Sequence, residues 1–189
     1  MRRCGGAHPL TVWITLTLEH VLVETARAFL GLGSNVGNRS AWLHRGLDGL
    51  RGAGLQVGAV SSFYLTEPVG DQTLPWFLNC AAEVHQPPEP RALLNAALQV
   101  EQGCGRCRSS TAVEPRTLDV DVLLYDLRVV DEYGLQIPHP RLHARRFVLR
   151  PLADLAADFL HPTFGVPISD LLLRLNAAER VWLLSPPPA

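Results

Sequence analysis

The 189-residue chain contains no lysine, so all 17 of its basic residues are arginines. This absence excludes every site that depends on a lysine, including the Walker-type phosphate loop and Schiff-base catalysis. A phosphate group bound by this chain must instead be held by arginine, histidine, backbone amides or a metal ion. Because biased base composition of a gene can itself remove lysine, the absence restricts the chemistry without indicating a function.

Aromatic residues and net charge are also scarce. Aromatic residues make up 7% of the chain and hydrophobic residues 47%, so aliphatic side chains must form most of the core. The net charge is −1, which gives no overall field to attract nucleic acid or an anionic membrane. We therefore expect a single domain without nucleic-acid or membrane partners.

The four cysteines include one close pair, Cys104-Gly-Arg-Cys107. A structural zinc site needs a second pair, and none exists in the sequence. A redox pair should follow a strand and open a helix, whereas this one follows a helical pattern and enters a loop. We expect incidental thiols in a reducing compartment and a cytoplasmic location.

Residues 1–26 carry Arg2-Arg3 and a short apolar run that loosely resembles a signal peptide. The run is too short to span a membrane, and no clean small-residue cleavage site follows it. We interpret residues 1–26 as an N-terminal extension, disordered or due to a misplaced start codon, and residues 27–189 as one domain. An export signal, or an extra strand or helix packed on the domain, stays open as an alternative.

Hydrophobic periodicity predicts four strands and two helices in the order βαββαβ. The expected strands are residues 28–32, 55–66, 77–85 and 115–125, and the helices are 38–53 and 89–102. This order is typical of an α+β, ferredoxin-like fold, an antiparallel sheet with helices on one face. Beyond this core we expect C-terminal additions, which are a short strand near 129–130 and helices near 145–155 and 168–175.

The fourth strand carries the strongest chemical signal, because Asp119 and Asp121 alternate with apolar residues and share one face. They stand about 6.6 Å apart along a strand, close enough to converge on one or two Mg²⁺ or Mn²⁺ ions. Arg116 adds a planar fork suited to phosphate oxygens. The pattern predicts metal-assisted phosphoryl or nucleotidyl chemistry, and the alternative is an exposed strand with two ordinary acids. The other face of the strand is expected to carry Leu118, Val120, Val122 and Leu124.

Several segments then resemble one family in their order along the chain. They are Gly33-Ser34-Asn35, residues 61–70, Phe77-Leu78-Asn79, Glu101-x4-Arg106-x-Arg108, Pro115–Asp121 and Pro138–Leu149. Together, over roughly residues 27–175, they resemble the 6-hydroxymethyl-7,8-dihydropterin pyrophosphokinase family of folate biosynthesis. The combination of Pro-Arg-Thr-Leu-Asp-x-Asp with Pro-His-Pro-Arg-Leu-His is the most specific part of this resemblance.

The resemblance implies transfer of the terminal pyrophosphoryl group of ATP to the hydroxymethyl oxygen of the pterin, with release of AMP. It implies that Asp119 and Asp121 hold two Mg²⁺ ions and act in catalysis together with Arg106 and Arg116. The positions that the resemblance assigns to ATP binding are Glu101, Arg106, Arg108, Arg116, Val122, His139 and Arg145.

For the pterin, the resemblance implies a stacking pair, Phe77 and Phe147, with Asn79 reading the edge of the ring. Thr66 and Val69 would add loop contacts. A flat, polar-edged heterocycle needs this combination of aromatic faces and amide hydrogen bonds. The expected partners are these two small molecules alone. We expect a monomer, with a weak dimer as the alternative.

The chain also departs from the family pattern at Ala112 and Val113, where many members carry a basic and an aromatic residue. Looser closure of this loop would affect rate and affinity rather than the type of reaction. A nucleotidyltransferase is disfavoured because Gly33-Ser34 lies far upstream of Asp119. A metal-dependent glycosyltransferase would need a larger nucleotide-binding domain. A non-catalytic ferredoxin-like binding module remains the alternative from another class.

Overall fold

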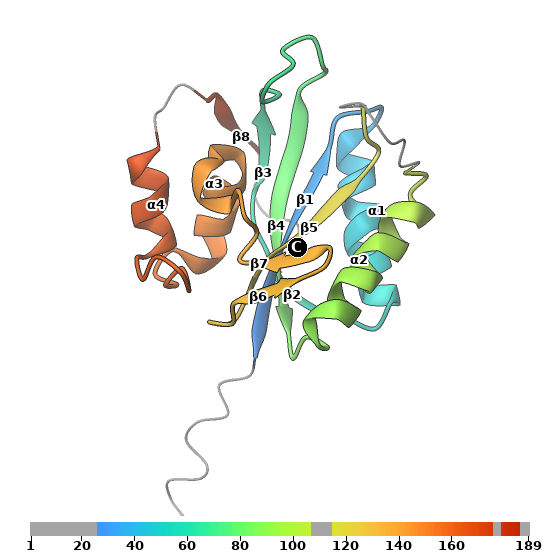
Figure 1. The fold of residues 1–189 in the computed structure, drawn as a ribbon. Helices are drawn as coiled ribbons and strands as arrows, with labels where there is room; N and C mark the ends of the chain where they lie inside the picture. Colours follow the sequence, from blue (N-terminus) through green and yellow to red (C-terminus); the bar gives the residue numbers. More distant parts are fainter. Residues whose placement is uncertain (1–25, 107–114, 176–178, 186–189) are drawn as a thin grey trace, which may run out of the picture.

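The computed structural model describes residues 26–106, 115–175 and 179–185, and a six-stranded antiparallel sheet forms its centre (Figure 1). The strand order is β5-β1-β4-β3-β8, and β2 also pairs with β4. The first four positions, β5-β1-β4-β3, have the ferredoxin-like order, so the predicted fold class is confirmed. The strands are β1 (Arg27–Ser34), β2 (Gln56–Val60), β3 (Phe63–Thr66), β4 (Phe77–His85), β5 (Asp119–Tyr125) and β8 (Val181–Ser185).

Helices α1 (Arg39–Gly52) and α2 (Pro90–Gly103) cover one face of the sheet (Figure 1). Asn38 caps α1 as predicted, since its side chain accepts a hydrogen bond from the Ala41 amide at 3.1 Å. The core under these helices is aliphatic and includes Leu30, Leu47, Leu93 and Val120.

Helices α3 (Arg146–Ala156) and α4 (Ile168–Arg174) lie on the opposite face of the sheet. Their apolar sides form a second core with Phe29 and Leu123. The sequence pattern predicted both helices, but the βαββαβ pattern places helices on one face only. The C-terminal additions therefore create a second layer, and the sheet face beneath that layer also carries the two aspartates.

The strand expected over residues 55–66 is in fact two strands, β2 and β3, separated at Ser61-Ser62. Ser61 interrupts the ladder because its hydroxyl accepts from the Ala81 amide at 2.8 Å, a role that a backbone carbonyl has in a regular strand. The Ser61 amide still donates to the Ala81 carbonyl at 2.9 Å. The prediction of one continuous strand was wrong at this point.

Strand β5 begins at Asp119 rather than at Pro115, and its alternation ends early. The register against β1 shifts between Phe29 and Leu30, which places one extra residue in β5 at Leu123. Leu124 therefore joins the core under α3 and α4, so its predicted place beside Val122 was wrong. The other predicted inward residues, Leu118, Val120 and Val122, lie together in the first core as expected.

The remaining elements lie beyond β5. They are the hairpin of β6 (Val130–Glu132) and β7 (Leu135–Ile137), and the short 3-10 helix η1 (Leu142–Ala144). Among the described residues, none of the helices is both long and apolar enough to cross a membrane. The expectations for residues 1–25, for Arg108, for Ala112 and Val113, and for Cys107 fall outside the described ranges. Cys104, at the end of α2, is buried.

Candidate active site

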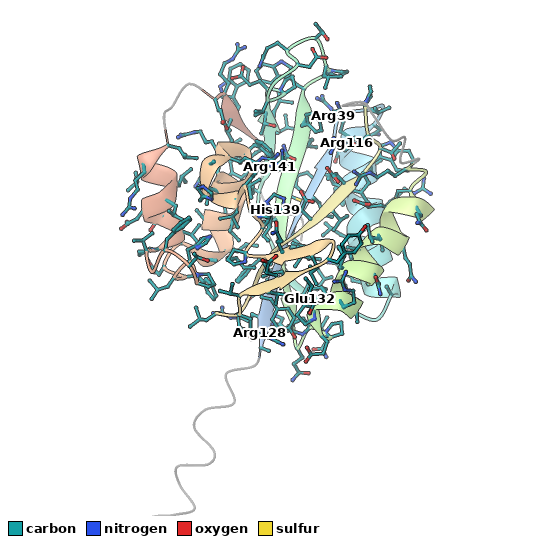
Figure 2. The ribbon with its side chains drawn as sticks, in the orientation of Figure 1. Arg39, Arg116, Arg128, Glu132, His139 and Arg141 are labelled. Atoms are coloured by element: carbon teal, nitrogen blue, oxygen red, sulfur yellow. The ribbon has the colours of Figure 1, made fainter. Side chains whose placement is uncertain are left out.

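A cavity of about 480 Å³ opens on the sheet face that α3 covers. It collects predicted site residues from segments that are far apart in the sequence. Those lining it are Thr66, Val69, Phe77, Asn79, Arg106, Arg116, Asp119, Asp121, His139, Arg145 and Phe147. Figure 2 shows Arg116, His139 and Arg141 in this region. Both the expected phosphate-binding residues and the expected pterin-binding residues therefore lie in one hollow.

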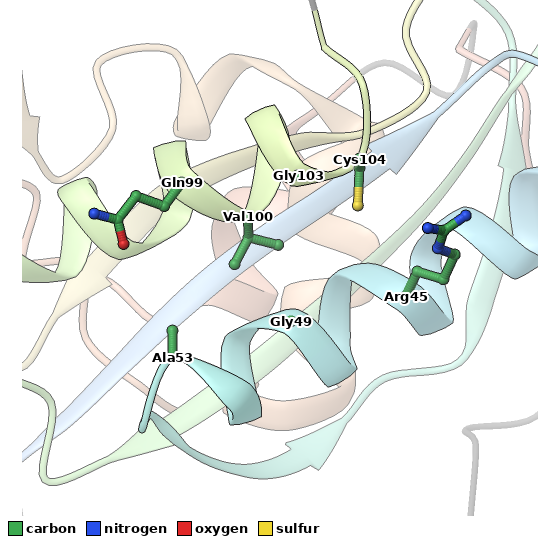
Figure 3. Close-up of a pocket in the computed structure, with 7 residues that line it drawn as sticks. All are labelled: Arg45, Gly49, Ala53, Gln99, Val100, Gly103 and Cys104. Atoms are coloured by element: carbon green, nitrogen blue, oxygen red, sulfur yellow. The ribbon is translucent and has the colours of Figure 1, made fainter.

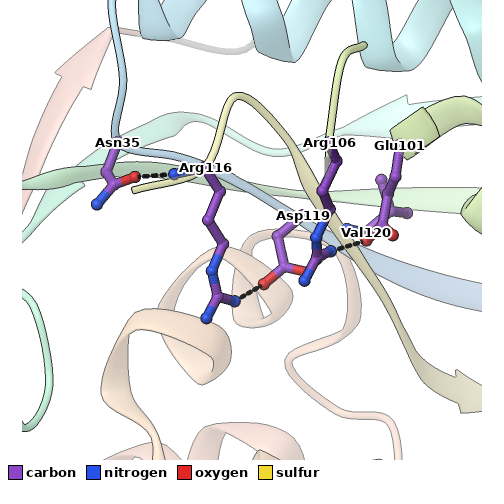
Figure 4. Close-up of polar contacts among 6 residues, drawn as sticks. All are labelled: Asn35, Glu101, Arg106, Arg116, Asp119 and Val120. Carbon is purple, nitrogen blue, oxygen red and sulfur yellow. Dashed lines mark hydrogen bonds and ion pairs between the residues drawn. The ribbon is translucent and has the colours of Figure 1, made fainter. Parts of the chain in front are cut away.

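Asp119 forms the centre of an arginine–carboxylate network (Figure 4). Arg106 donates to one of its carboxylate oxygens and Arg116 to the other. Burial opposes ionisation of Asp119, but these two guanidinium groups outweigh it and hold the pKa of Asp119 below its usual value. Asp119 is therefore a carboxylate at neutral pH.

Glu101 lies behind this network rather than in the cavity. It is buried, accepts a hydrogen bond from the Val120 amide at 2.8 Å and also accepts from Arg106 (Figure 4). Its position at the end of α2 therefore fixes both strand β5 and the guanidinium of Arg106. This is a positioning contact, made one layer away from the place where a nucleotide would bind.

Asp121 lies two residues after Asp119 on the same face of β5. Burial and the neighbouring Asp119 charge raise the pKa of Asp121 to about 6, although Arg145 acts in the opposite direction. Two close carboxylates with opposed pKa shifts are typical of a functional site, and a bound cation would relieve their repulsion.

Asn35 is a site residue to which the sequence analysis assigned no role. It is 2% exposed, and its side-chain Oδ1 accepts from the backbone amide of Arg116 at 2.6 Å. The backbone amide of Asn35 donates in return to the Arg116 carbonyl at 3.1 Å. Its side-chain amide also donates to the Pro75 carbonyl at 3.4 Å. The motif Gly33-Ser34-Asn35 was the available signal, since an asparagine directly after a strand often bonds to the backbone.

Asn79 and Thr66, two of the expected pterin-binding residues, lie beside the end of β1, where Asn79 pairs with Gly33. Asn79 donates from its side-chain amide to the Thr66 hydroxyl at 2.8 Å, which orients the amide. A Cβ at Gly33 would lie 2.6 Å from Asn79 Oδ1, so only glycine leaves room for that amide. Phe147 lies across the cavity with the Arg145 guanidinium 5.4 Å from its ring centre.

His139 is held in a defined tautomer by the residues that follow it. Its Nδ1 accepts from the Arg141 amide at 3.2 Å, so the proton of the neutral ring lies on Nε2. Burial, followed by the charges of Arg145 and Arg141, lowers the pKa of His139 to about 4. His139 is thus a neutral hydrogen-bond donor at physiological pH. Arg141, to which the sequence analysis gave no role, also lines the cavity.

Two of the expected ATP-binding residues do not line the cavity. Glu101 lies behind it, and the Val122 side chain points to the opposite face and packs in the first core. Arg108, a third expected residue, is outside the described ranges.

The donor set of the cavity fits a magnesium ion bound together with a substrate. Within the described ranges, no group of three or more metal-binding side chains occurs. Magnesium is commonly held by one or two carboxylates, with substrate phosphates and water completing its octahedron. Asp119 and Asp121 supply that number of carboxylates, and the surrounding arginines would accommodate the phosphates.

A second cavity, of about 350 Å³, lies between α1 and α2 on the other side of the sheet (Figure 3). Its charged lining residue is Arg45, whose guanidinium lies 4.8 Å from the centre of the Trp42 ring. Cys104 also lines it, and burial raises the pKa of this thiol. The cavity brings no carboxylate near the arginine, so the first cavity is the candidate active site.

Comparison with known proteins agrees with this geometry. Residues 29–157 match the family described as 7,8-dihydro-6-hydroxymethylpterin-pyrophosphokinase. The 2-amino-4-hydroxy-6-hydroxymethyldihydropteridine pyrophosphokinase of Methylorubrum extorquens is 40% identical over 158 residues, which cover 82% of this chain and 98% of the relative. A Bacillus subtilis protein of the same name is 40% identical over 129 residues, which cover 68% of this chain and 77% of the relative.

A similar fold occurs in the crystal structure of wild-type Plasmodium falciparum HPPK-DHPS with pteroate. The TM-score is 0.62 at 14% sequence identity, and the match covers 80% of this chain and 44% of the other. At this identity the likeness concerns the fold alone, and it agrees with the ferredoxin-like order of the strands.

Proposed function

Because the chain belongs to the 7,8-dihydro-6-hydroxymethylpterin-pyrophosphokinase family, we propose a specific role for each part of its cavity in that reaction. The chain transfers pyrophosphate from ATP onto the hydroxymethyl group of the dihydropterin in folate biosynthesis. When the β and γ phosphates leave together, the bond between the α and β phosphates breaks and AMP is released. The single observation that carries the proposal is that the aspartate pair lies beside the arginines in one cavity. We refer to the expected phosphate-binding and pterin-binding residues of this cavity as its phosphate half and its pterin half.

The phosphate half of the site consists of Arg106, Arg116, Arg145 and His139. Their charge and hydrogen bonds neutralise and orient the phosphates, which is the main requirement of phosphoryl transfer. In the free protein both oxygens of Asp119 accept from Arg106 and Arg116. The two guanidinium groups therefore compete with a cation for Asp119, and the phosphates of ATP would relieve this competition by offering the arginines another anion.

Asp119 and Asp121 would hold Mg²⁺, and the resemblance to the family implies two ions. The bound Mg²⁺ would neutralise charge on the ATP phosphates and on the attacking hydroxyl. Two observations support this assignment. The carboxylates share one face of β5, and burial, followed by the neighbouring Asp119 charge, raises the pKa of Asp121. Magnesium favours such hard oxygen ligands.

The pterin half consists of Phe77, Phe147, Asn79, Thr66 and Val69. The two phenylalanines supply stacking faces for a flat heterocycle. Asn79 is oriented by Thr66 and has a second N–H and an Oδ1 with which to read the polar edge of the ring. Because these residues and the two aspartates line one cavity, a pterin bound here would have its hydroxymethyl group near the phosphates.

We further infer that residues 27–189 act as one domain, in the cytoplasm and as a monomer. The support for one domain is that β8, near the C-terminus, pairs with β3 in the same sheet as β1. The described residues of one chain line the whole of the cavity that the structure shows, which supports action as a monomer.

The direct test combines purified protein, Mg-ATP and 6-hydroxymethyl-7,8-dihydropterin and identifies the nucleotide product. The proposal predicts AMP that forms only when the pterin is present. Pterin-dependent ADP would instead indicate transfer of a single phosphoryl group. Absence of turnover would favour the non-catalytic binding module.

A further inference from the structure

Strand β8 lies outside the segment that matches the family, which ends at residue 157. It forms the edge of the sheet beside β3 (Figure 1), and Val181 pairs with Thr66 while Trp182 pairs with Leu65. Thr66 is the last residue of β3 and the first residue of the pterin half of the cavity. The beginning of β8 is therefore next to the loop of residues 67–76, which connects β3 to β4.

Arg180, directly before β8, binds the first residue of this loop. Its guanidinium donates from Nε to Glu67 Oε2 at 2.7 Å, and its amide donates to Glu67 Oε1 at 3.0 Å. The Glu67 amide donates in turn to the Arg180 carbonyl at 3.3 Å. Three hydrogen bonds, one of them an ion pair, thus join one residue of the C-terminal segment to the start of the loop.

The same segment also contacts Trp76, the last residue of the loop. The Arg180 guanidinium lies 4.9 Å from the centre of the Trp76 ring, and the Trp182 ring lies 5.0 Å away, centre to centre. From the other side, Arg39 donates to the Trp76 carbonyl at 2.6 Å. Arg180 therefore connects both ends of the loop to the edge of the sheet, and Trp182 reinforces the second end.

The loop is part of the cavity, since Glu67, Pro68, Val69 and Leu74 line it, and Phe77 follows the loop directly. We propose that Arg180 and Trp182 are positioning residues for the pterin: they hold the β3–β4 loop, with Val69 and Phe77, in its substrate-binding position. The inference rests on the proposed function and extends it to a C-terminal segment to which the family match assigns nothing.

The contacts are of a kind that controls a loop rather than the stability of the whole fold. The Arg180 side chain is 56% exposed and Trp182 is 53% exposed, so neither belongs to the core. Ordering a loop before the ligand arrives removes an entropic cost from binding. Loss of these contacts should therefore weaken pterin binding while the phosphate half of the site, to which neither Arg180 nor Trp182 belongs, stays intact.

The test measures KM for the pterin, KM for ATP and kcat by AMP formation. For Arg180→Ala and Trp182→Ala we expect the pterin KM to rise roughly threefold to tenfold, since small displacements of a binding loop have effects of at least this size. The ATP KM and kcat at saturating pterin should stay within about twofold of wild type. Arg180→Lys keeps a cation for Glu67 and should recover part of the affinity.

Two control variants separate positioning from general destabilisation. Leu183→Ala removes an exposed side chain from the same strand, and Arg174→Ala removes an exposed arginine of α4. Both should keep the wild-type pterin KM. Arg180→Gln gives the same test as Arg180→Ala if the alanine variant does not fold. An unchanged pterin KM in both the Arg180 and the Trp182 variants would overturn the inference. An equal rise in the pterin KM and the ATP KM would overturn it as well. An inactive wild type would instead overturn the proposed function.

Discussion

Asn35 and Arg116 are joined by two reciprocal hydrogen bonds, so the end of β1 and the segment before β5 form one rigid unit (Figure 4). Asn35 also donates to the Pro75 carbonyl, in the loop that carries part of the pterin half. Asn35 therefore fixes the backbone of Arg116, for which we propose phosphate binding, and also contacts the loop that precedes β4.

Replacement of Asn35 by alanine should lower both activity and stability. The partly buried Arg116 amide loses its acceptor, and an unsatisfied buried donor typically costs about 1–3 kcal/mol of unfolding free energy. Because the Arg116 backbone also loses the hydrogen bond that holds it in place, we expect kcat/KM for ATP to fall. Denaturant unfolding and steady-state kinetics measure the two effects. Asn38→Ala is the matched control, since it removes the α1 cap, worth about 1 kcal/mol, without touching Arg116. If both variants lose stability and both keep wild-type kinetics, the role assigned to Asn35 is wrong.

Gly33→Ala should impair the pterin half of the site selectively. The new methyl group would lie 2.6 Å from Asn79 Oδ1 and force that amide out of its position. We expect a higher KM for the pterin and a loss of about 1–3 kcal/mol in stability from overpacking. Gly52→Ala serves as the control, because a Cβ there meets no atom within 4 Å. Equal pterin KM values in the two variants would contradict the assignment of Asn79.

Magnesium should bind weakly to the free protein and strongly in the presence of a non-hydrolysable ATP analogue. The reason is that Arg106 and Arg116 already neutralise Asp119 and compete with a cation for its oxygens, whereas bound phosphates would draw these arginines away. Titration calorimetry with Mg²⁺, with and without the analogue, measures the difference. Tight binding of Mg²⁺ to the free protein would show that the arginine network does not compete with the metal.

Tyr64 and Asp154 should make stability depend on pH in the alkaline range. The Tyr64 hydroxyl contacts both Asp154 oxygens, at 2.9 and 2.8 Å, and so joins β3 to α3. Burial, then the Asp154 hydrogen bond and charge, raise the pKa of Tyr64 from 10.0 to about 12. The folded protein thus holds this proton more tightly than the unfolded chain. The resulting stability is complete below pH 10 and is lost as the pH rises toward 12.

Tyr64→Phe tests this expectation. At neutral pH it should lose about 1.5–3 kcal/mol, the usual contribution of a hydrogen bond to a charged group. The difference in unfolding free energy between wild type and variant should shrink as the pH rises above 10, because the variant has no hydroxyl to titrate. A constant difference across that range would exclude Tyr64 as the titrating group.

Most of the fold and much of the site could be predicted from the sequence because they depend on local patterns. Examples are the alternation around Asp119, the Asn38 cap and the apolar stripe of α2. Each of these patterns is formed by residues that are close together in the sequence. These patterns predicted the order of elements, and the resemblance to a family predicted eleven of the residues that line the cavity.

The features that sequence could not predict depend on contacts between distant segments. The interruption at Ser61 depends on Ala81, and the turn of Leu124 to the second core depends on the register against Phe29. The place of Glu101 behind Arg106, rather than in the cavity, follows from the packing of α2 against β5. Strand β8 is short, and its partner in the sheet, β3, lies far upstream in the sequence.

The central claim is that the aspartate pair acts between ATP and the pterin, and kcat of Asp121→Asn tests it most directly. Asp121 suits this test because, in the ranges that the structure describes, its side chain takes part in no hydrogen bond or ion pair whose loss would disturb the fold, and its backbone pairing with β1 is unaffected by the substitution. Removal of one oriented charge-stabilising contact typically costs about 10²–10³ in rate. At saturating ATP, Mg²⁺ and pterin, the account predicts a loss of this size in pterin-dependent AMP formation by a folded variant. A kcat close to that of wild type would contradict it.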